Sequence, residues 1–324
     1  SIDPSGTVTI VTHRSEMGTG IRTSLPMVVA DELEAEWTRV KLVQALADEP
    51  RYGNQDTDGS RSMRHFIQPM RQCGAAMRQM LEQAAANQWK VPVGEVRARN
   101  HEVLHQASGR KLGYGDLAQA AMDIPVPPIE QLNLKPDAEF RYMGKGNIGI
   151  YDLHDITTGK AQYGQDVVRP GMKYAVVARP PVVGGRVKAF DDKAALEVPG
   201  VERIIEIPTQ DPRVKYTPLG GIAVVANSTW AAIKGREALK IEWDNGSNAS
   251  YDSAAYKAAM ERTARGPAKI VRDEGDPEKA FAGAAKKMSA EYYVPHLACA
   301  PMEPMVATAV AGDGQCEVWA PLQY

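Results

Sequence analysis

The chain has 324 residues, 44% of them hydrophobic, and a formal net charge of −2 from 38 Lys and Arg against 40 Asp and Glu. This length and composition allow two or three globular domains with sizeable cores. The balanced charge, without a basic block, gives no basis for binding nucleic acid or an anionic membrane surface. We therefore expect a small-molecule or protein partner and no nucleic acid.

Alternating β-type residues over 7–13 predict a strand at the start of the chain. The stretch SEMGTGIRTS, residues 15–24, follows and places two glycines around a threonine. A helix should then begin with Ser24 as its N-cap and Pro26 near its first turn, and should end at about Trp37. The first segment is thus predicted to be a strand, a glycine-rich turn and a helix.

A second helix is expected over about 63–88, where Pro69 should kink the helix or mark its true start. Cys73 lies among methionines that recur at near-helical intervals, so these side chains should face the core. The methionines are Met63, Met70, Met77 and Met80. A short third helix should open at 115–117, and the proline-rich stretch DIPVPPIEQLNLKP after it should be a linker.

From about Arg141, glycine-punctuated strands predict a small α+β domain that closes near Trp243. A helix over 254–265 and two strands, in KKMSAEYYVPHL and QCEVWAPLQY, should follow. The strands of the small domain are expected in YAVVARPP, GGRVKAF, VERIIEIP and GIAVVANS, with short helices in DKAALEVPG and TWAAIKGREALK. The fold class is therefore α+β.

The sequence contains three cysteines, Cys73, Cys299 and Cys316, which lack the CxxC spacing of zinc, haem or iron–sulfur sites. No apolar run approaches the roughly 18 residues that a membrane-spanning helix requires. His296 and Cys299 are close in sequence, but two ligands make a weak zinc site. We expect buried, reduced thiols and no metal ion held by the side chains of this chain.

Two glycine-containing turns precede helices in the first segment. Gly18 and Gly20 permit positive φ angles, and free N–H groups at a helix start form a site for an anion such as phosphate. The stretch GSRS at 59–62 repeats this arrangement before the second helix. Glycine spacing alone leaves both as ordinary capped turns, because neither matches G-x-G-x-x-G or a Walker loop. Together, the two turns favour a large phosphorylated ligand.

The stretch SEMGTGIRTSLPMVVADEL resembles the E-M-G-Q-G-x-x-T loop of the molybdenum hydroxylases, the xanthine dehydrogenase and aldehyde oxidase family. GSRSM resembles a serine-bearing loop that helps to hold the pterin cofactor of that family. Two stretches resemble the α/β hammerhead domain of the family: TGKAQYGQDVVRPGMKYAVVARPPVVGGRVKAFD and GIAVVANSTWAAIKGREALKIEWD. Two later stretches resemble the start of its second cofactor-binding region: HLACAPMEPMVATA and CEVWAPLQ. The order of these segments resembles the large subunits of the isoquinoline 1-oxidoreductase type and of related aldehyde and nicotinate dehydrogenases.

The resemblance implies two molybdopterin-binding α/β segments that flank a small α/β hammerhead domain. Residues 1–140 would form the N-terminal molybdopterin-binding segment and residues 141–246 the hammerhead. Residues 247–324 would form the start of the second molybdopterin-binding region, which is truncated. The implied cofactor is molybdenum with molybdopterin cytosine dinucleotide.

The resemblance also assigns site residues. Thr19 stands where the family loop has a glutamine, so its shorter hydroxyl should contribute less than the N–H groups of Gly18 and Gly20. Gln323 aligns with the glutamine near the apical oxo ligand of molybdenum; the alternative is a strand-end residue that faces solvent. Glu303 in APMEP is expected to cap or to form an ion pair rather than to act in catalysis. The implied cofactor-binding residues are Gly18, Thr19, Gly20, Gly59, Ser60, Arg61, Ser62 and Gln323.

The family reaction is hydroxylation with water as the oxygen source, and the electrons leave through iron–sulfur clusters. The general-base glutamate of the family lies in a G-E-P motif that this sequence lacks, as it lacks the G-G-F-G loop of the family. We therefore expect about the first half of a large subunit, inactive alone. Its expected partners are the remaining half, a small 2Fe-2S subunit and a cytochrome c subunit. The substrate would be an aldehyde or an N-heteroaromatic compound.

Two alternatives remain open. Large subunits of this subgroup often carry a twin-arginine leader, so the expected location is the periplasm after removal of a leader, with the cytoplasm as the alternative. A cofactor-free scaffold or binding module that keeps the fold is the alternative function, and Thr19 and the missing base favour it for this chain alone.

Overall fold

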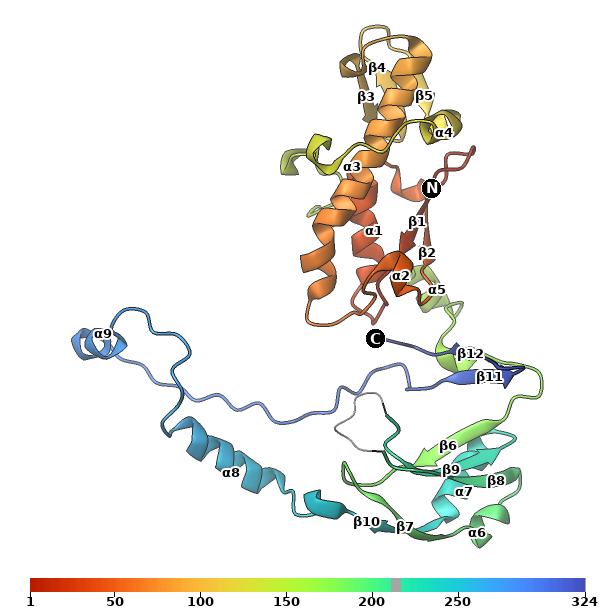
Figure 1. The fold of residues 1–324 in the computed structure, drawn as a ribbon, viewed down its shortest axis with the longest axis vertical. Helices are drawn as coiled ribbons and strands as arrows, with labels where there is room; N and C mark the ends of the chain where they lie inside the picture. The colour runs from red at the N-terminus through yellow and green to blue at the C-terminus, as the bar shows by residue number, and fades with distance from the viewer. Residues whose placement is uncertain (211–216, 324) are drawn as a thin grey trace. The chain divides into compact units, whose positions relative to one another are not determined.

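The computed structural model describes residues 1–210 and 217–323. The chain divides into two compact units, one of Ser1–Val167 with Glu303–Tyr324 and one of Val168–Met302. Both units combine helices with strands (Figure 1), as the α+β prediction requires. None of the helices in the described ranges is long and apolar enough to cross a membrane.

The first unit begins with a β–α–β arrangement. Strands β1 (Val8–Thr12) and β2 (Val40–Gln44) pair in parallel, and helix α1 (Ile21–Glu32) lies between them in the sequence. Thr12 pairs with Gln44 at the end of the ladder, so both strands end at the same edge. The strand predicted over 7–13 is confirmed as β1, whereas β2 has no counterpart in the prediction.

Helix α1 differs from the prediction at both ends. Its N-cap is Gly20 rather than Ser24, which lies inside the helix. The helix ends twelve residues later because Glu34 turns the chain with a φ of 58°. Trp37 then starts a separate 3₁₀ turn, Trp37–Arg39. At the start of α1, a carboxylate described below accepts the N–H groups of Gly20 and Arg22.

Helix α3 (Arg61–Trp89) confirms the predicted second helix and contains Pro69 within its length. It runs beside α1 (Figure 1). At Gly74 a Cβ atom would lie 2.6 Å from the Val29 carbonyl oxygen of α1, so only glycine permits this close crossing. The buried face of α3 consists mainly of small residues: Gly74, Ala75, Ala84, Ala85 and Ala86, with Leu81.

The predicted burial of methionines and cysteines is only partly correct. Met70 and Met77 pack against the core, but all four methionines of α3 are only partly buried. Cys73, Cys299 and Cys316 are exposed, so the expectation of buried thiols is wrong. The reason at Cys73 is that the neighbouring Gly74 and Ala75 form the seam against α1 and turn the cysteine outward.

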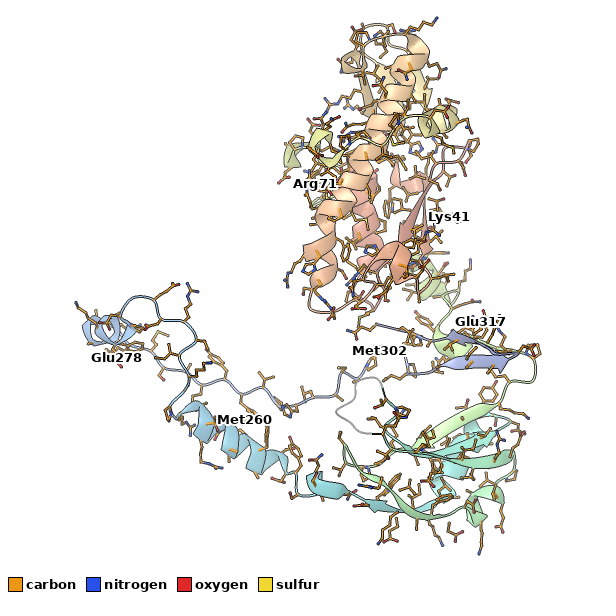
Figure 2. All side chains as sticks on the ribbon, in the orientation of Figure 1. Lys41, Arg71, Met260, Glu278, Met302 and Glu317 are labelled. Carbon is orange, nitrogen blue, oxygen red and sulfur yellow. The ribbon has the colours of Figure 1, made fainter. Side chains whose placement is uncertain are left out.

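A buried ion cluster fixes the carboxyl end of α1. Asp31 and Glu32 are both 0% exposed. Glu32 Oε1 accepts a hydrogen bond from Arg71 Nε at 2.6 Å, and Arg71 projects from α3 (Figure 2). Lys135 of the linker donates its Nζ to Asp31 Oδ1 at 2.9 Å. These bonds hold α1, α3 and the linker together.

The remaining elements of the first unit include a three-stranded antiparallel sheet and an antiparallel hairpin. The predicted third helix is confirmed as α4, and residues 123–136 contain no α-helix or strand, as predicted for a linker. The elements are α2 (Glu49–Tyr52), β3 (Val96–Arg99), β4 (Glu102–His105), β5 (Lys111–Gly113), α4 (Tyr114–Met122), α5 (Leu153–Thr158), β11 (Thr308–Gly312) and β12 (Gln315–Trp319).

The second unit contains an antiparallel sheet of order β6–β9–β8, a separate pair of β7 with β10, and a helix, α7, against the sheet. A Cβ at Gly235 of α7 would lie 2.7 Å from Val201 Cγ2, so glycine lets the helix approach the sheet. The predicted strands and short helices are confirmed. Their bounds are β6 (Tyr174–Ala178), β7 (Arg186–Asp191), α6 (Lys193–Leu196), β8 (Val201–Ile207), β9 (Gly221–Ala226), α7 (Thr229–Ala238) and β10 (Lys240–Asp244).

Two helices follow the sheet, α8 (Ser253–Ala264) and α9 (Pro277–Gly283). The first confirms the helix predicted over 254–265, and β12 confirms the strand predicted in QCEVWAPLQY. The strand predicted in KKMSAEYYVPHL is wrong, because residues 286–297 form no strand in the structure. A strand requires a hydrogen-bonding partner, which sequence alternation alone does not supply.

Candidate functional site

The three sequence segments proposed for the site meet at one residue, Thr57. Thr57 Oγ1 donates to the Ser15 carbonyl oxygen at 2.7 Å, which ties the loop after β2 to the loop after β1. The Thr57 N–H donates to the Gln323 carbonyl oxygen at 3.0 Å, and Gln323 Nε2 donates back to the Thr57 carbonyl oxygen at 2.9 Å. The site therefore lies beyond the carboxyl ends of the parallel strands β1 and β2.

The loop before α1 is held by the carboxylate of Glu16. Glu16 Oε1 accepts N–H groups of Met17, Thr19 and Gly20 at 2.9, 2.7 and 3.0 Å, and Oε2 accepts the N–H of Arg22 at 2.9 Å. A carboxylate here also complements the positive end of the helix dipole. The expectation of free N–H groups at this helix start is thus wrong for Gly20, because the chain supplies its own anion.

The glycines of this loop are required by backbone geometry rather than by close packing. Gly18 and Gly20 have φ angles of 82° and 79°, and a Cβ at either would meet no atom within 4 Å. Thr19 between them is exposed. The loop therefore presents an open surface with the Thr19 hydroxyl accessible.

Removal of the Glu16 carboxylate should destabilise the first unit. We expect Glu16→Ala to lower the free energy of unfolding by about 0.5–2 kcal/mol, the usual cost of losing a helix cap. Glu16→Gln should lose less, because its amide oxygen still accepts one N–H group. Glu130→Ala, at an exposed site, is the matched control for chemical denaturation. Equal midpoints for the two alanine variants would contradict the capping role.

The second loop also starts a helix with positive φ angles, 49° at Gly59 and 55° at Ser60. The Ser60 hydroxyl is exposed and makes no capping bond. Arg61 Nε donates to Asp58 Oδ1 at 2.8 Å. Ser62 is 5% exposed, and its Oγ accepts a hydrogen bond from Arg14 Nε at 2.9 Å. The Ser60 hydroxyl thus faces outward, whereas Arg61 is half-buried and paired with Asp58, and Ser62 is a buried connection.

Sequence analysis missed His13 and Arg14, which are 6% and 1% exposed. Burial, aided by the charge of Arg14, lowers the pKa of His13 to about 4, so this imidazole is neutral at pH 7. In residues 1–210 and 217–323, His13 Nε2 and Arg14 Nη2 lack hydrogen-bond partners. Their only sequence signal is a pair of basic residues directly after an apolar strand.

The other candidate residues lie as follows. Glu303 Oε1 accepts the N–H of Gly164 at 2.8 Å, a contact of the capping type, although its side chain is half-buried rather than buried. His296 lies beside the ring of Tyr256, with ring centroids 5.3 Å apart. Across the described part of the chain, no group of three His, Cys, Asp or Glu side chains is placed to hold a metal ion.

Two protein-family models match this chain. Models described as molybdopterin cofactor-binding domains match residues 1–161 and 262–324. The chain is 32% identical to the beta subunit of isoquinoline 1-oxidoreductase from Brevundimonas diminuta, over 78% of this chain and 36% of that protein. It is 31% identical to the membrane-bound aldehyde dehydrogenase [pyrroloquinoline-quinone] of Gluconacetobacter polyoxogenes, over 100% of this chain and 42% of that protein.

A third relative is a nicotinate dehydrogenase subunit of Pseudomonas putida, 27% identical over 100% of this chain and 26% of that protein. The chain thus spans less than half the length of these relatives. Among solved structures, quinoline 2-oxidoreductase from Pseudomonas putida 86 overlaps 29% of this chain and 15% of its own, with 22% identity and a TM-score of 0.23. From the two cofactor-binding domain matches and the named relatives, the chain belongs to the molybdopterin-binding oxidoreductase family.

Proposed function

We propose that this chain forms part of the cofactor site of a molybdenum-dependent oxidoreductase. The substrate is an aldehyde or an N-heteroaromatic compound, with water as the oxygen source. The observation that carries this proposal is the meeting of the 15–20 loop, the 57–62 loop and Gln323 at Thr57. Ligands of open α/β sheets bind beyond the carboxyl ends of parallel strands, where these segments lie.

The residues at this edge suit a pterin cofactor with phosphate groups. The exposed hydroxyls of Thr19 and Ser60 and the guanidinium of Arg61 are hydrogen-bond donors. Arg14 Nη2 adds a buried N–H that no described residue accepts. When bound, the cofactor supplies the redox chemistry, which amino-acid side chains do not provide. The residues of the chain hold and orient it.

Each segment has a distinct proposed task. Ser60 and Arg61 contact the cofactor from the start of α3, and Gly18 and Thr19 contact it from the loop before α1. Gly20 acts through the shape of its turn, because Glu16 accepts its N–H. Ser62 acts indirectly, by holding Arg14.

Gln323 is proposed to orient the reacting centre. One of its two amide hydrogens is donated to the Thr57 carbonyl oxygen, which fixes the side chain. The second hydrogen remains to be donated to a group that gains negative charge during the reaction. Since this chain lacks the G-E-P glutamate, we place the general base elsewhere in the assembled protein.

Further features of the assembled protein are proposed on the family resemblance. They are a cytosine dinucleotide form of the cofactor, a hammerhead domain over 141–246, a 2Fe-2S subunit and a cytochrome c subunit as electron acceptors, and a periplasmic location. Two relatives are named as subunits, which supports a multi-subunit enzyme. The alternative is a scaffold without a cofactor.

Molybdenum content of the assembled protein tests this function. Gly18→Val should lower it several-fold, because the side chain covers the open surface of the loop. Gly146→Val is the matched control, since Gly146 also has a positive φ, 67°, and open space around it. The paired change Ser60→Ala with Ser62→Ala should lower molybdenum retention about tenfold, at about 0.5–1.5 kcal/mol for each hydrogen bond lost. Full occupancy in the Gly18 and paired serine variants would reject the assignment.

A further inference from the structure

Arg14 is a buried arginine without a carboxylate partner. Its Nε donates to Ser62 Oγ at 2.9 Å, and its Nη1 donates to the main-chain and side-chain oxygens of Asn54, both at 2.6 Å. Among residues 1–210 and 217–323, it forms no ion pair and its Nη2 lacks an acceptor. A buried guanidinium normally has a paired charge and satisfied N–H groups, because desolvation is otherwise costly.

The nearby carboxylates are engaged by other residues. Asp56 accepts from Asn54 Nδ2 at 2.6 Å and lies 3.6 Å from the guanidinium of Arg61. Asp58 accepts from Arg61 Nε at 2.8 Å. Neither of these carboxylates therefore accepts a hydrogen bond from Arg14 Nη2.

An aromatic ring covers one face of the Arg14 guanidinium. The guanidinium lies over the ring of Phe66, 4.9 Å from its centroid, and the His13 ring meets the same ring at 4.5 Å. His13 is neutral at pH 7, so Arg14 carries the only positive charge of this pair. An anionic acceptor would complete the hydrogen bonds of Arg14 and add to the negative charge that Asp56 and Asp58 already place near it.

We propose that Arg14 binds a phosphate oxygen of the pterin cofactor through Nη2. Its Nε and Nη1 meanwhile bind Ser62 and Asn54. Arg14 directly precedes the 15–20 loop, so its bond to Ser62 joins that loop to the 57–62 loop. A guanidinium suits this task because its planar fork matches phosphate oxygens. This inference rests on the proposed function and adds a binding residue that the family resemblance does not assign.

The test is Arg14→Lys in the assembled protein. Lysine keeps the charge but cannot reach Ser62, Asn54 and a phosphate at once. We expect cofactor retention, measured as molybdenum per chain, to weaken about tenfold to a hundredfold, the value of one or two charge-assisted hydrogen bonds. The difference between the unfolding midpoints of the loaded and the cofactor-free protein should shrink in parallel.

Arg78→Lys is the matched control, because Arg78 is also buried and donates to the Glu32 carbonyl oxygen at 2.6 Å. It should lower the loaded and cofactor-free midpoints equally and leave their difference unchanged. Wild-type retention and an unchanged difference in Arg14→Lys would overturn the inference and indicate a water at Nη2. If inorganic phosphate alone gives the full midpoint shift, the site takes free phosphate, which also overturns it. A wild-type protein without molybdenum would instead reject the proposed function, and this inference with it.

Discussion

Replacement of Asp31 by asparagine should lower the free energy of unfolding by about 3–5 kcal/mol, the usual cost of breaking a buried ion pair. Asp31 is 0% exposed, and its carboxylate accepts Lys135 Nζ at 2.9 Å. It also accepts the N–H groups of Arg141, Tyr142 and Met143 at 3.0, 2.9 and 2.9 Å. Asparagine removes one of the two carboxylates that Lys135 contacts, the other being Glu34, and turns an amide donor toward N–H groups.

The effect should depend on pH. Burial alone would raise the pKa of Asp31, but the bonds from Lys135 and from the three N–H groups outweigh it and lower the pKa. A carboxyl group whose pKa is lowered in the folded state stabilises that state at pH values above its unfolded pKa of about 3.9. This contribution disappears as the pH falls through the folded pKa. The difference between wild type and Asp31→Asn should therefore shrink below about pH 4.

Chemical denaturation at pH 7 and at acidic pH provides the measurement. Asp137→Asn, at an exposed position directly after the linker, should change the free energy of unfolding by less than about 0.5 kcal/mol. A pH-independent difference for Asp31→Asn would show that its charge does not stabilise the fold.

Gln323→Ala should reduce turnover of the assembled enzyme about tenfold to a hundredfold while leaving molybdenum content nearly unchanged. One hydrogen bond to a group that gains charge in the transition state contributes about 1.5–3 kcal/mol, and each 1.36 kcal/mol is about a factor of ten in rate. The main-chain bond from Thr57 to residue 323 does not need the side chain, so the strand end should stay in place.

Steady-state kinetics on protein normalised to molybdenum checks this prediction. Gln315→Ala is the control, because Gln315 is also an exposed glutamine, at the start of β12. Equal turnover in both variants would mean that the Gln323 side chain does not reach the reacting centre.

Sequence patterns predicted the helices and strands that carry a clear periodicity within their own residues. The β-type alternation over 7–13 and the helical spacing over 63–88 correspond to β1 and α3. The start of α1 was mispredicted because Ser24 has the preferred N-cap residue type, whereas Glu16 supplies the actual capping oxygens from six residues before Arg22. A glutamate four residues before Gly20 was the available signal.

The site was predictable in its segments but not in its connections. The loops at 15–20 and 59–62 and Gln323 could be named from motifs, but Thr57 joins them through bonds across as many as 266 residues. Arg14 was missed because arginine is rarely buried. Its burial depends on Ser62, which lies 48 residues away, and sequence periodicity carries no information on such a contact.

Metal and nucleotide analysis of the wild-type assembled protein tests the central claim most directly. The cofactor should be released by acid from protein purified from its native host, and its metal, nucleotide and any quinone should be quantified. We predict about one molybdenum per chain together with a cytidine nucleotide. Absence of molybdenum, or a stoichiometric pyrroloquinoline quinone in its place, would contradict the proposal that the loops joined at Thr57 hold a molybdenum pterin cofactor.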